Sequence, residues 1–156
     1  MRINLVFVGK TGIGDIESAI DRYVERLQHY RPVEIHYVRA EKIAAASGDN
    51  LVRERESERI LKLAGRRGHL VVLDRSGREF DSKGLAKLIE KLMGSGISDI
   101  WMAVGGPAGV SSQLLKTAHQ VLSLSKMTFP HDLARLMLVE QLYRAFTIIR
   151  GEPYNR

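Results

Sequence analysis

Residues 123–156 read SLSKMTFPHDLARLMLVEQLYRAFTIIRGEPYNR, and this stretch decides how the rest of the chain is interpreted. Pro130 separates an extended segment from a helix that carries apolar residues on nearly every face. A helix that is apolar all round is buried. A serine, a lysine and a threonine precede Pro130, and a charged and aromatic tail follows Gly151. Polar groups at both ends of a rigid buried element predict a functional site.

Outward from this helix, extended apolar runs alternate with segments of helical period. The expected strands are residues 3–9, 33–39, 70–74, 100–105 and 121–129. Helices are expected at residues 15–30, 50–64 and 111–119, and the terminal helix follows Pro130. Another helix is expected after the capping candidates Asp81 and Ser82, and a loop at residues 40–49. This order predicts an α/β fold, a mostly parallel sheet flanked by helices on both faces. Ligands bind such sheets at the carboxyl ends of the strands.

Length and composition predict a single domain, residues 1–156, in the cytoplasm. The chain has no cysteine, which excludes disulfides, cysteine-ligated zinc and thiol nucleophiles. Its five histidines show no metal-ligand spacing, so no metal is expected. No run approaches the roughly 20 apolar residues of a membrane span, and the N-terminus lacks a signal-peptide pattern. The net charge of +6 favours an acidic partner such as RNA.

The first carboxyl-end loop, VGKTGIG at residues 8–14, resembles a phosphate-binding loop. A P-loop would need a glycine at the position of Asn4, and Gly9, Gly12 and Gly14 do not fit the dinucleotide pattern either. The spacing therefore favours an ordinary turn between a strand and a helix.

The other two loops have the composition of a ligand site. Residues 105–109 contain three glycines, which allow a flat ligand to approach the backbone but also suit an ordinary turn. Residues 124–129 combine hydroxyl groups, backbone donors and acceptors, and apolar side chains, a mixture suited to a neutral heterocycle. By themselves they could equally form a core strand.

Specific motifs now indicate a family. The most specific motifs are LSKMTFPH, LVEQLYRA and RGEPY, and they are preceded, in the family's order, by INLVFVGK, LVVLD and VGGPAGV. Through these motifs, the whole chain is similar to the ribosomal RNA large subunit methyltransferase H family. The resemblance implies the SPOUT methyltransferase architecture with a C-terminal trefoil knot, which periodicity cannot predict. It also implies S-adenosylmethionine as cofactor and a homodimer. The implied reaction methylates N3 of a pseudouridine in 23S ribosomal RNA, on assembled ribosomes.

The resemblance assigns roles to individual positions. Its cofactor contacts fall on Leu73, Gly105, Leu124, Ser125, Lys126, Met127, Thr128 and Phe129. His131 is the first candidate for the base that removes the N3 proton, and a helix-capping role is the alternative. Tyr154 is expected to meet the target base on a tail that folds over the pocket. Asn155 stands where the family commonly has a histidine, which argues against an acid–base role there.

Charged and apolar residues of the terminal helix predict further contacts. The four-residue spacing from Glu140 favours an ion pair with Arg144 and leaves Arg135 to contact RNA, together with Arg144 itself and Arg156. Arg53, Arg55, Arg66, Arg67 and Lys83 are expected either to extend this RNA surface or to form a solvated face. Some of Leu138, Val139, Leu142, Ile148 and Ile149 are expected to cross a two-fold interface, with burial inside one subunit as the alternative.

Two other functions remain open at this point. A protein of this fold could bind the ribosome without catalysis, and cofactor binding would separate that function from an enzyme. A methyltransferase of the same fold could instead act on transfer RNA, which the identity of the RNA that accepts the methyl group would reveal.

Overall fold

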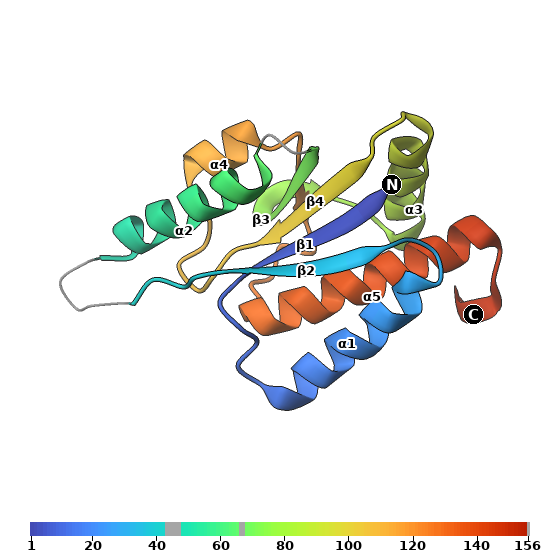
Figure 1. The fold of residues 1–156 in the computed structure, drawn as a ribbon, viewed down its shortest axis with the longest axis horizontal. Helices are drawn as coiled ribbons and strands as arrows, with labels where there is room; N and C mark the ends of the chain where they lie inside the picture. The colour runs from blue at the N-terminus through green and yellow to red at the C-terminus, as the bar shows by residue number, and fades with distance from the viewer. Residues whose placement is uncertain (43–47, 66–67, 156) are drawn as a thin grey trace.

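The computed structural model describes residues 1–42, 48–65 and 68–155. Its strands are β1 (Arg2–Val8), β2 (Val33–Val38), β3 (His69–Glu79), β4 (Asp99–Val104) and β5 (Gln120–Ser123). Its helices are α1 (Gly14–Gln28), α2 (Gly48–Ala64), α3 (Ser82–Gly94), α4 (Ser112–Thr117) and α5 (His131–Arg150), followed by the 3-10 turn η1 (Pro153–Asn155). Strands and helices alternate along the chain as the sequence predicts (Figure 1).

The strands form one sheet in the order β2-β1-β4-β3-β5. Every pairing between these described strands is parallel. The carboxyl ends of all five strands therefore lie toward the same edge of the sheet, where α/β proteins bind ligands. The predicted α/β class is confirmed, whereas the trefoil knot stays a prediction.

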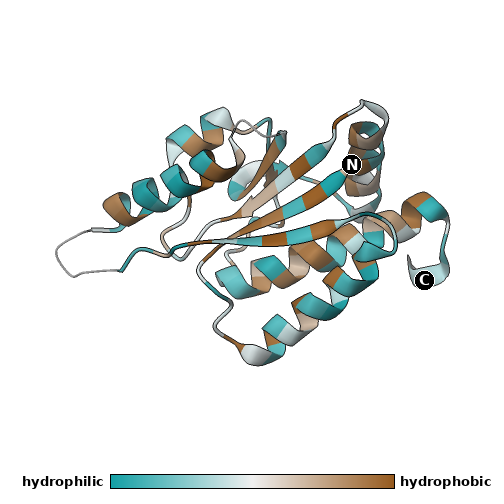
Figure 2. Cartoon of the chain, in the orientation of Figure 1, coloured by the Kyte–Doolittle hydropathy of each residue, from teal (hydrophilic) through white to brown (hydrophobic). Residues whose placement is uncertain are grey.

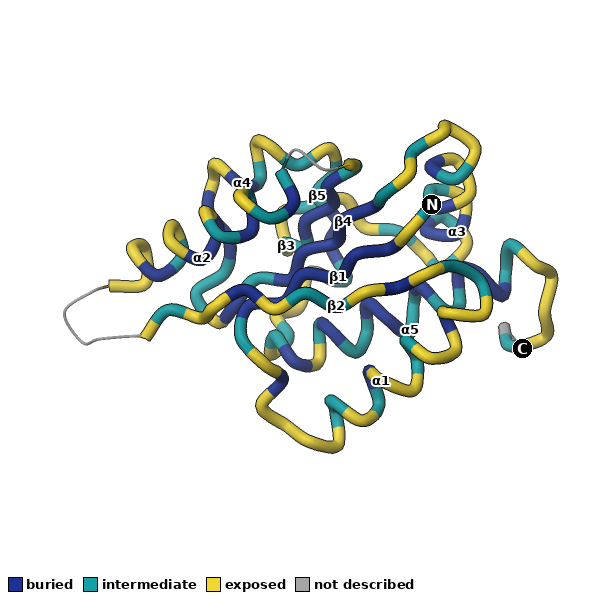
Figure 3. Tube along the Cα trace, in the orientation of Figure 1, coloured by how far each residue is buried: buried dark blue, intermediate teal, exposed yellow. Residues whose placement is uncertain are grey.

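Two helical layers cover the sheet, with α2 and α4 on one face and α1, α3 and α5 on the other (Figure 1). β1 shows how the alternation of side chains serves both layers. Ile3, Leu5 and Phe7 join the core beneath α1, α3 and α5, whereas Val6 and Val8 face α2 and α4. Figure 3 shows the buried central strands and the more exposed outer helix faces, and Figure 2 shows how hydrophobic and hydrophilic residues are distributed over the same elements.

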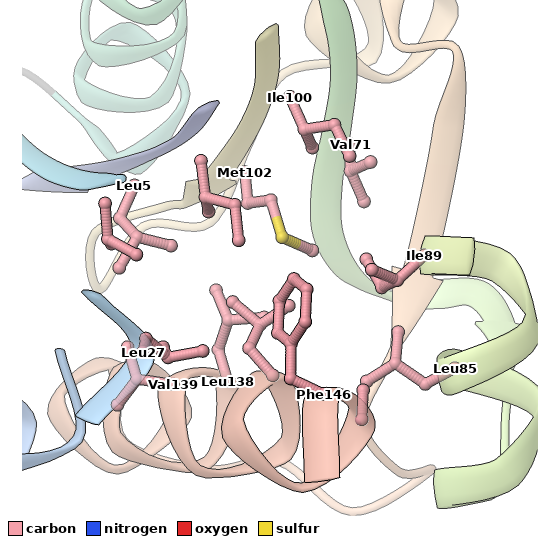
Figure 4. Packing of buried hydrophobic residues seen from close by; sticks show 14 of the residues in the cluster. Leu5, Leu27, Val71, Leu85, Ile89, Ile100, Met102, Leu138, Val139 and Phe146 are labelled. Atoms are coloured by element: carbon pink, nitrogen blue, oxygen red, sulfur yellow. The ribbon is translucent and has the colours of Figure 1, made fainter. Parts of the chain in front are cut away.

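Helix α5 is the main buried helix of the larger core. Leu138, Val139 and Leu142 are all buried, and in Figure 4 Leu138 points toward the sheet whereas Val139 lies beside Leu27 of α1. Ile148 and Ile149 are partly buried against the same core. Burial inside one subunit therefore explains Leu138, Val139 and Leu142 without a two-fold interface.

The helix ends follow their sequence signals. Asp81 caps α3 by accepting a hydrogen bond from the Gly84 amide, and the Ser111 hydroxyl accepts one from the Leu114 amide at the start of α4. Gly151 ends α5 in the left-handed conformation, with φ of 68°. None of the described helices is both long and apolar enough to cross a membrane.

The prediction of a strand at residues 121–129 is wrong for its second part, because β5 ends at Ser123. The Ser123 hydroxyl donates a hydrogen bond to the Ser125 carbonyl, and the Met127 amide donates one to the Ser125 hydroxyl, both at 3.0 Å. These local bonds take the place of ladder bonds. Residues 124–129 consequently form a loop at the ligand-binding edge.

Two other boundaries also differ from expectation. β3 continues past residue 74 to Glu79, with a shift in its register against β5 between Leu73 and Arg78. Gly77 permits this continuation, since a Cβ there would lie only 2.7 Å from the backbone of Leu122. In the expected loop at 40–49, residues 43–47 lie outside the described part, and α2 already begins at Gly48.

Candidate active site

A cavity of about 740 Å³ opens beside the ends of β3, β4 and β5. This volume lies within the roughly 300–1,000 Å³ of small-molecule sites. The predicted cofactor positions line it with the exception of Lys126, namely Leu73, Gly105, Leu124, Ser125, Met127, Thr128 and Phe129. The structure therefore brings three segments that are distant in sequence to one pocket.

The glycine-rich loop after β4 forms one wall of this pocket. A Cβ on Gly105 would lie 2.7 Å from the Val110 side chain, so the loop closes tightly on itself. The Gly109 amide donates a hydrogen bond to the Gly106 carbonyl at 2.9 Å, and Gly109 has φ of 80°. The same glycines thus make both the turn and the pocket wall, so the two interpretations of this loop are compatible.

The wall composition suits S-adenosylmethionine. Leu73, Leu124 and Phe129 supply apolar surface for a heterocycle, and Gly105 brings backbone close to it. Ser125 adds a hydroxyl group at the pocket. Within residues 1–42, 48–65 and 68–155, no group of three or more histidine, cysteine or acidic residues has metal-site geometry.

His131 lines the pocket from the first turn of α5. Its Nε2 atom lies 3.3 Å from Oδ1 of Asp132, whose side chain is only 7% exposed. The imidazole can therefore accept a proton beside a carboxylate that stabilises the resulting positive charge. Pro130 occupies the N-cap position of α5 without a side-chain hydrogen bond, so the capping alternative for His131 finds no support in the geometry.

Arg135 differs most from its sequence-based expectation. Its side chain is 0% exposed, and its guanidinium donates hydrogen bonds to the Thr11 hydroxyl, the Asp132 carboxylate and the Val8 carbonyl. Its Cζ atom also lies 5.1 Å from the centre of the Phe7 ring. Burial lowers the pKa of Arg135, and Asp132 opposes that shift. A side chain so enclosed cannot reach RNA from this position, so the expectation of a direct contact is corrected.

The same cluster explains the loop that resembles a P-loop. The Gly12 amide donates a hydrogen bond to Oδ2 of Asp132 at 3.0 Å, and Thr11 contacts Arg135 as described. The loop after β1 therefore anchors the start of α5, beside His131. Sequence reasoning missed Asp132, although its position three residues before Arg135 was a usable indication.

Farther along α5, the predicted ion pair between Glu140 and Arg144 is confirmed. Two guanidinium nitrogens of Arg144 lie 2.6 and 3.1 Å from Oε1 of Glu140, and both side chains remain partly exposed. This pairing raises the pKa of Arg144. The Arg144 Cζ atom lies 4.9 Å from the centre of the Tyr154 ring.

The tail is docked against its own subunit instead of folding freely over the pocket. The Tyr154 hydroxyl lies 3.2 Å from both the Tyr23 hydroxyl and Oε1 of Glu140, and its ring contacts Tyr143. Burial raises the pKa of Tyr154, and the contacts with Tyr23 and Glu140 add to this effect. Tyr154 does not line the cavity described above. Arg156 lies outside the described residues.

The pocket rim carries charges of both signs. Arg53 reaches it from α2 and donates a hydrogen bond from Nε to the Ala108 carbonyl at 2.9 Å. Asp74 and Arg75 line the opposite segment, at positions that sequence reasoning did not single out. Of the other basic residues expected at the surface, Arg55 pairs with Glu41 and Lys83 is exposed, whereas Arg66 and Arg67 lie outside the described residues.

The fold and pocket place the chain in a known class. Residues 1–155 match a family model described as a predicted SPOUT methyltransferase. The structure is also similar to that of a probable methylase family protein from Haemophilus influenzae Rd KW20, with a TM-score of 0.56. That similarity covers 99% of this chain and 70% of the other at 15% identity, so it concerns the fold alone.

Curated relatives narrow the class further. A protein from Syntrophobacter fumaroxidans named ribosomal RNA large subunit methyltransferase H is 55% identical over 157 residues, covering 100% of both chains. Proteins of the same name from Halothermothrix orenii and Geotalea uraniireducens are 43% and 39% identical, covering 100% and 99% of both chains. The chain therefore belongs to the SPOUT methyltransferases and, within them, to the ribosomal RNA large subunit methyltransferase H family.

Proposed function

We propose that this chain methylates ribosomal RNA of the large subunit with S-adenosylmethionine as donor. More specifically, we propose N3 of a pseudouridine in 23S ribosomal RNA as the acceptor and the assembled ribosome in the cytoplasm as the substrate. The observation that carries this proposal is the pocket at the ends of β3, β4 and β5, where the cofactor positions implied by the family meet His131. The names of the relatives support the same substrate class.

The chain's own residues have two tasks in this reaction. S-adenosylmethionine, when bound, supplies a methyl group that is already activated by a positively charged sulfur. The pocket walls at Leu73, Gly105 and Leu124 hold the donor in a fixed orientation, which lowers the entropic cost of reaching the transition state. His131 accepts the N3 proton of the pseudouridine as N3 becomes bonded to the methyl carbon. Asp132 stabilises the imidazolium that results.

We further propose that the working form is a homodimer and that Tyr154 acts at the site of the partner subunit. Tyr154 lies away from the pocket of its own subunit, so a contribution in the same subunit would need the tail to leave its docked position. Exposed apolar side chains near the pocket, Met127 at 70% and Leu133 at 39%, support an interface there. Light scattering coupled to size exclusion tests the dimer.

RNA contacts are proposed for Arg144 and Arg156, with Arg135 removed from this group because it is buried. Arg144 is partly exposed and carries its positive charge beside Tyr154. An aromatic ring next to a guanidinium is a common platform for an unstacked RNA base. Lys126, exposed beside the pocket loop but absent from its lining, is retained as a cofactor contact only through its backbone.

The decisive experiment is transfer of labelled methyl groups from S-adenosylmethionine to ribosomes from cells that lack this protein, followed by mapping of the modified nucleotide. Label on a large-subunit pseudouridine is the expected result. Cofactor binding without label on ribosomes would favour another RNA, such as transfer RNA. Absence of both binding and label would favour a ribosome-binding factor without catalysis.

A further inference from the structure

A buried carboxylate lies directly behind the glycine wall of the pocket. Glu56, in the middle of α2, is 2% exposed. Its Oε1 atom accepts a hydrogen bond from the Glu41 amide at 2.9 Å. Among the residues that the structure describes, its Oε2 atom has no hydrogen-bond partner. A buried oxygen without a partner is costly, so its presence calls for a physical explanation.

The position of this oxygen relates it to the pocket. A Cβ on Gly106 would lie 2.8 Å from Oε2 of Glu56, so the carboxylate faces the bare backbone of a residue that lines the cavity. Two other residues of α2 hold the same loop in place. Arg53 donates to the Ala108 carbonyl, and the Ser57 hydroxyl accepts from the Ser111 amide at 2.8 Å. The carboxylate therefore lies directly behind Gly106, a residue of the pocket wall.

The charges around Glu56 leave its negative charge poorly compensated. Arg59, one turn later on α2, pairs with Glu41, as does Arg55. The charges of Arg59 and of His131 on α5 also act on Glu56, without a direct ion pair. Within residues 1–42, 48–65 and 68–155, no ion pair involves Glu56 itself. A cation in the pocket would thus be the missing partner.

We infer that the Glu56 carboxylate makes the pocket prefer a positively charged sulfonium ligand over its neutral thioether counterpart. This inference rests on the proposed function, in which the donor is a sulfonium and the demethylated product is a thioether. Charge interactions are weakly screened in a buried environment, whereas those of the partly exposed Asp74, which also lines the pocket, are screened more by water and salt. Loss of the positive charge on methyl transfer removes this attraction, which favours release of the product.

The pH dependence of binding has a defined sign. Burial raises the pKa of Glu56, opposed by the hydrogen bond from Glu41 and by the charges of Arg59 and His131. As pH rises through this pKa, the carboxyl group becomes negative, so affinity for the sulfonium rises while affinity for the thioether does not. This trend should be absent in Glu56→Gln, because the amide does not ionise.

Calorimetric titration with S-adenosylmethionine and S-adenosylhomocysteine tests the inference on wild type, Glu56→Gln and a matched control, Glu58→Gln. Glu58 is on the same helix but exposed and paired with Lys62 at 2.8 Å. For Glu56→Gln we expect the Kd of the sulfonium to rise about tenfold, equivalent to about 1.4 kcal/mol, and that of the thioether to change less than about twofold. Glu58→Gln should change neither.

Equal weakening of both ligands, or no change in either, would overturn the inference while leaving the proposed function intact. Failure of the wild type to bind either ligand would instead overturn the proposed function. If Glu56→Gln does not fold, proton release can be measured on the wild type by titration in buffers of different ionisation enthalpy. Greater proton release with the sulfonium than with the thioether is expected, and equal release would contradict the inference.

Discussion

Helix α5 carries two arginines with acidic neighbours, and their surroundings differ sharply. Arg135, three residues after Asp132, is fully enclosed and also serves Val8 and Thr11 on the first loop. Arg144, four residues after Glu140, stays partly exposed and touches the tail. The two ion pairs look alike in sequence, yet only the first joins distant parts of the fold. The comparison shows that one helix can enclose one arginine completely and leave another partly exposed to solvent.

The strongest test of this difference is Arg135→Ala. Removing one partner of a buried pair leaves Asp132 and the Val8 carbonyl uncompensated, so we expect the free energy of unfolding to fall by about 3–5 kcal/mol. Urea denaturation at a fixed protein concentration measures it, so that association between chains does not enter the comparison. The double substitution Arg135→Met with Asp132→Leu should recover part of the loss. A loss no larger than that of Arg144→Ala would remove the distinction.

The second test separates chemistry from structure at the start of α5. His131→Ala should lower kcat by about 100-fold, since general-base contributions are of order 10²–10⁴, while cofactor affinity stays close to that of wild type. Stability should change by less than about 1 kcal/mol, because the contact with Asp132 is partly exposed. Methyl-transfer kinetics and urea denaturation provide the two readings.

His29→Ala is the matched control, because that ring is exposed and makes a hydrogen bond with the carbonyl of Arg26 in its own helix turn. It should leave kcat unchanged. Full activity in His131→Ala would exclude His131 as the base and leave it as a pocket-lining residue.

The contrast between the arginines also shows what sequence could predict. The pair of Glu140 and Arg144 follows from the geometry of one helix, so a spacing of four residues was sufficient. The partners of Arg135 include Thr11, which lies 124 residues earlier in the chain. Only the folded topology, which brings the end of β1 beside the start of α5, reveals that contact. Charge and spacing alone therefore predicted that Arg135 contacts RNA, whereas the structure buries its side chain in the core.

The pocket, too, could be predicted from the sequence only in part. Alternation of strands and helices placed three loops at one edge, and the resemblance identified the positions that line the cavity there. The serines at 123 and 125 ended β5 early through bonds with nearby backbone, a local competition that apolar pattern does not register. Glu56 was not singled out from the sequence, because glutamates are mostly exposed and nothing in the local pattern indicates its burial.

A third test concerns the docked tail beside Arg144. Tyr154→Phe removes the hydroxyl contacts with Tyr23 and Glu140, so we expect a loss of about 1 kcal/mol in unfolding free energy and faster amide exchange in residues 151–155. If Tyr154 also acts at the partner's site, kcat falls in the same variant. Tyr37→Phe, at a ring that is 44% exposed, is the control. Unchanged exchange in the tail would show that these bonds do not hold it.

Only a small effect on stability is expected for Arg144→Ala, so this variant can be used to test RNA binding. A partly exposed ion pair contributes no more than about 1 kcal/mol, so the variant stays folded. If Arg144 contacts a phosphate, the slope of log affinity for ribosomal RNA against log salt should fall by about 1, with cofactor affinity unchanged. Binding measured over a salt series gives this slope. An unchanged slope would argue against a phosphate contact of Arg144, and Arg135 and Arg144 would then both be structural.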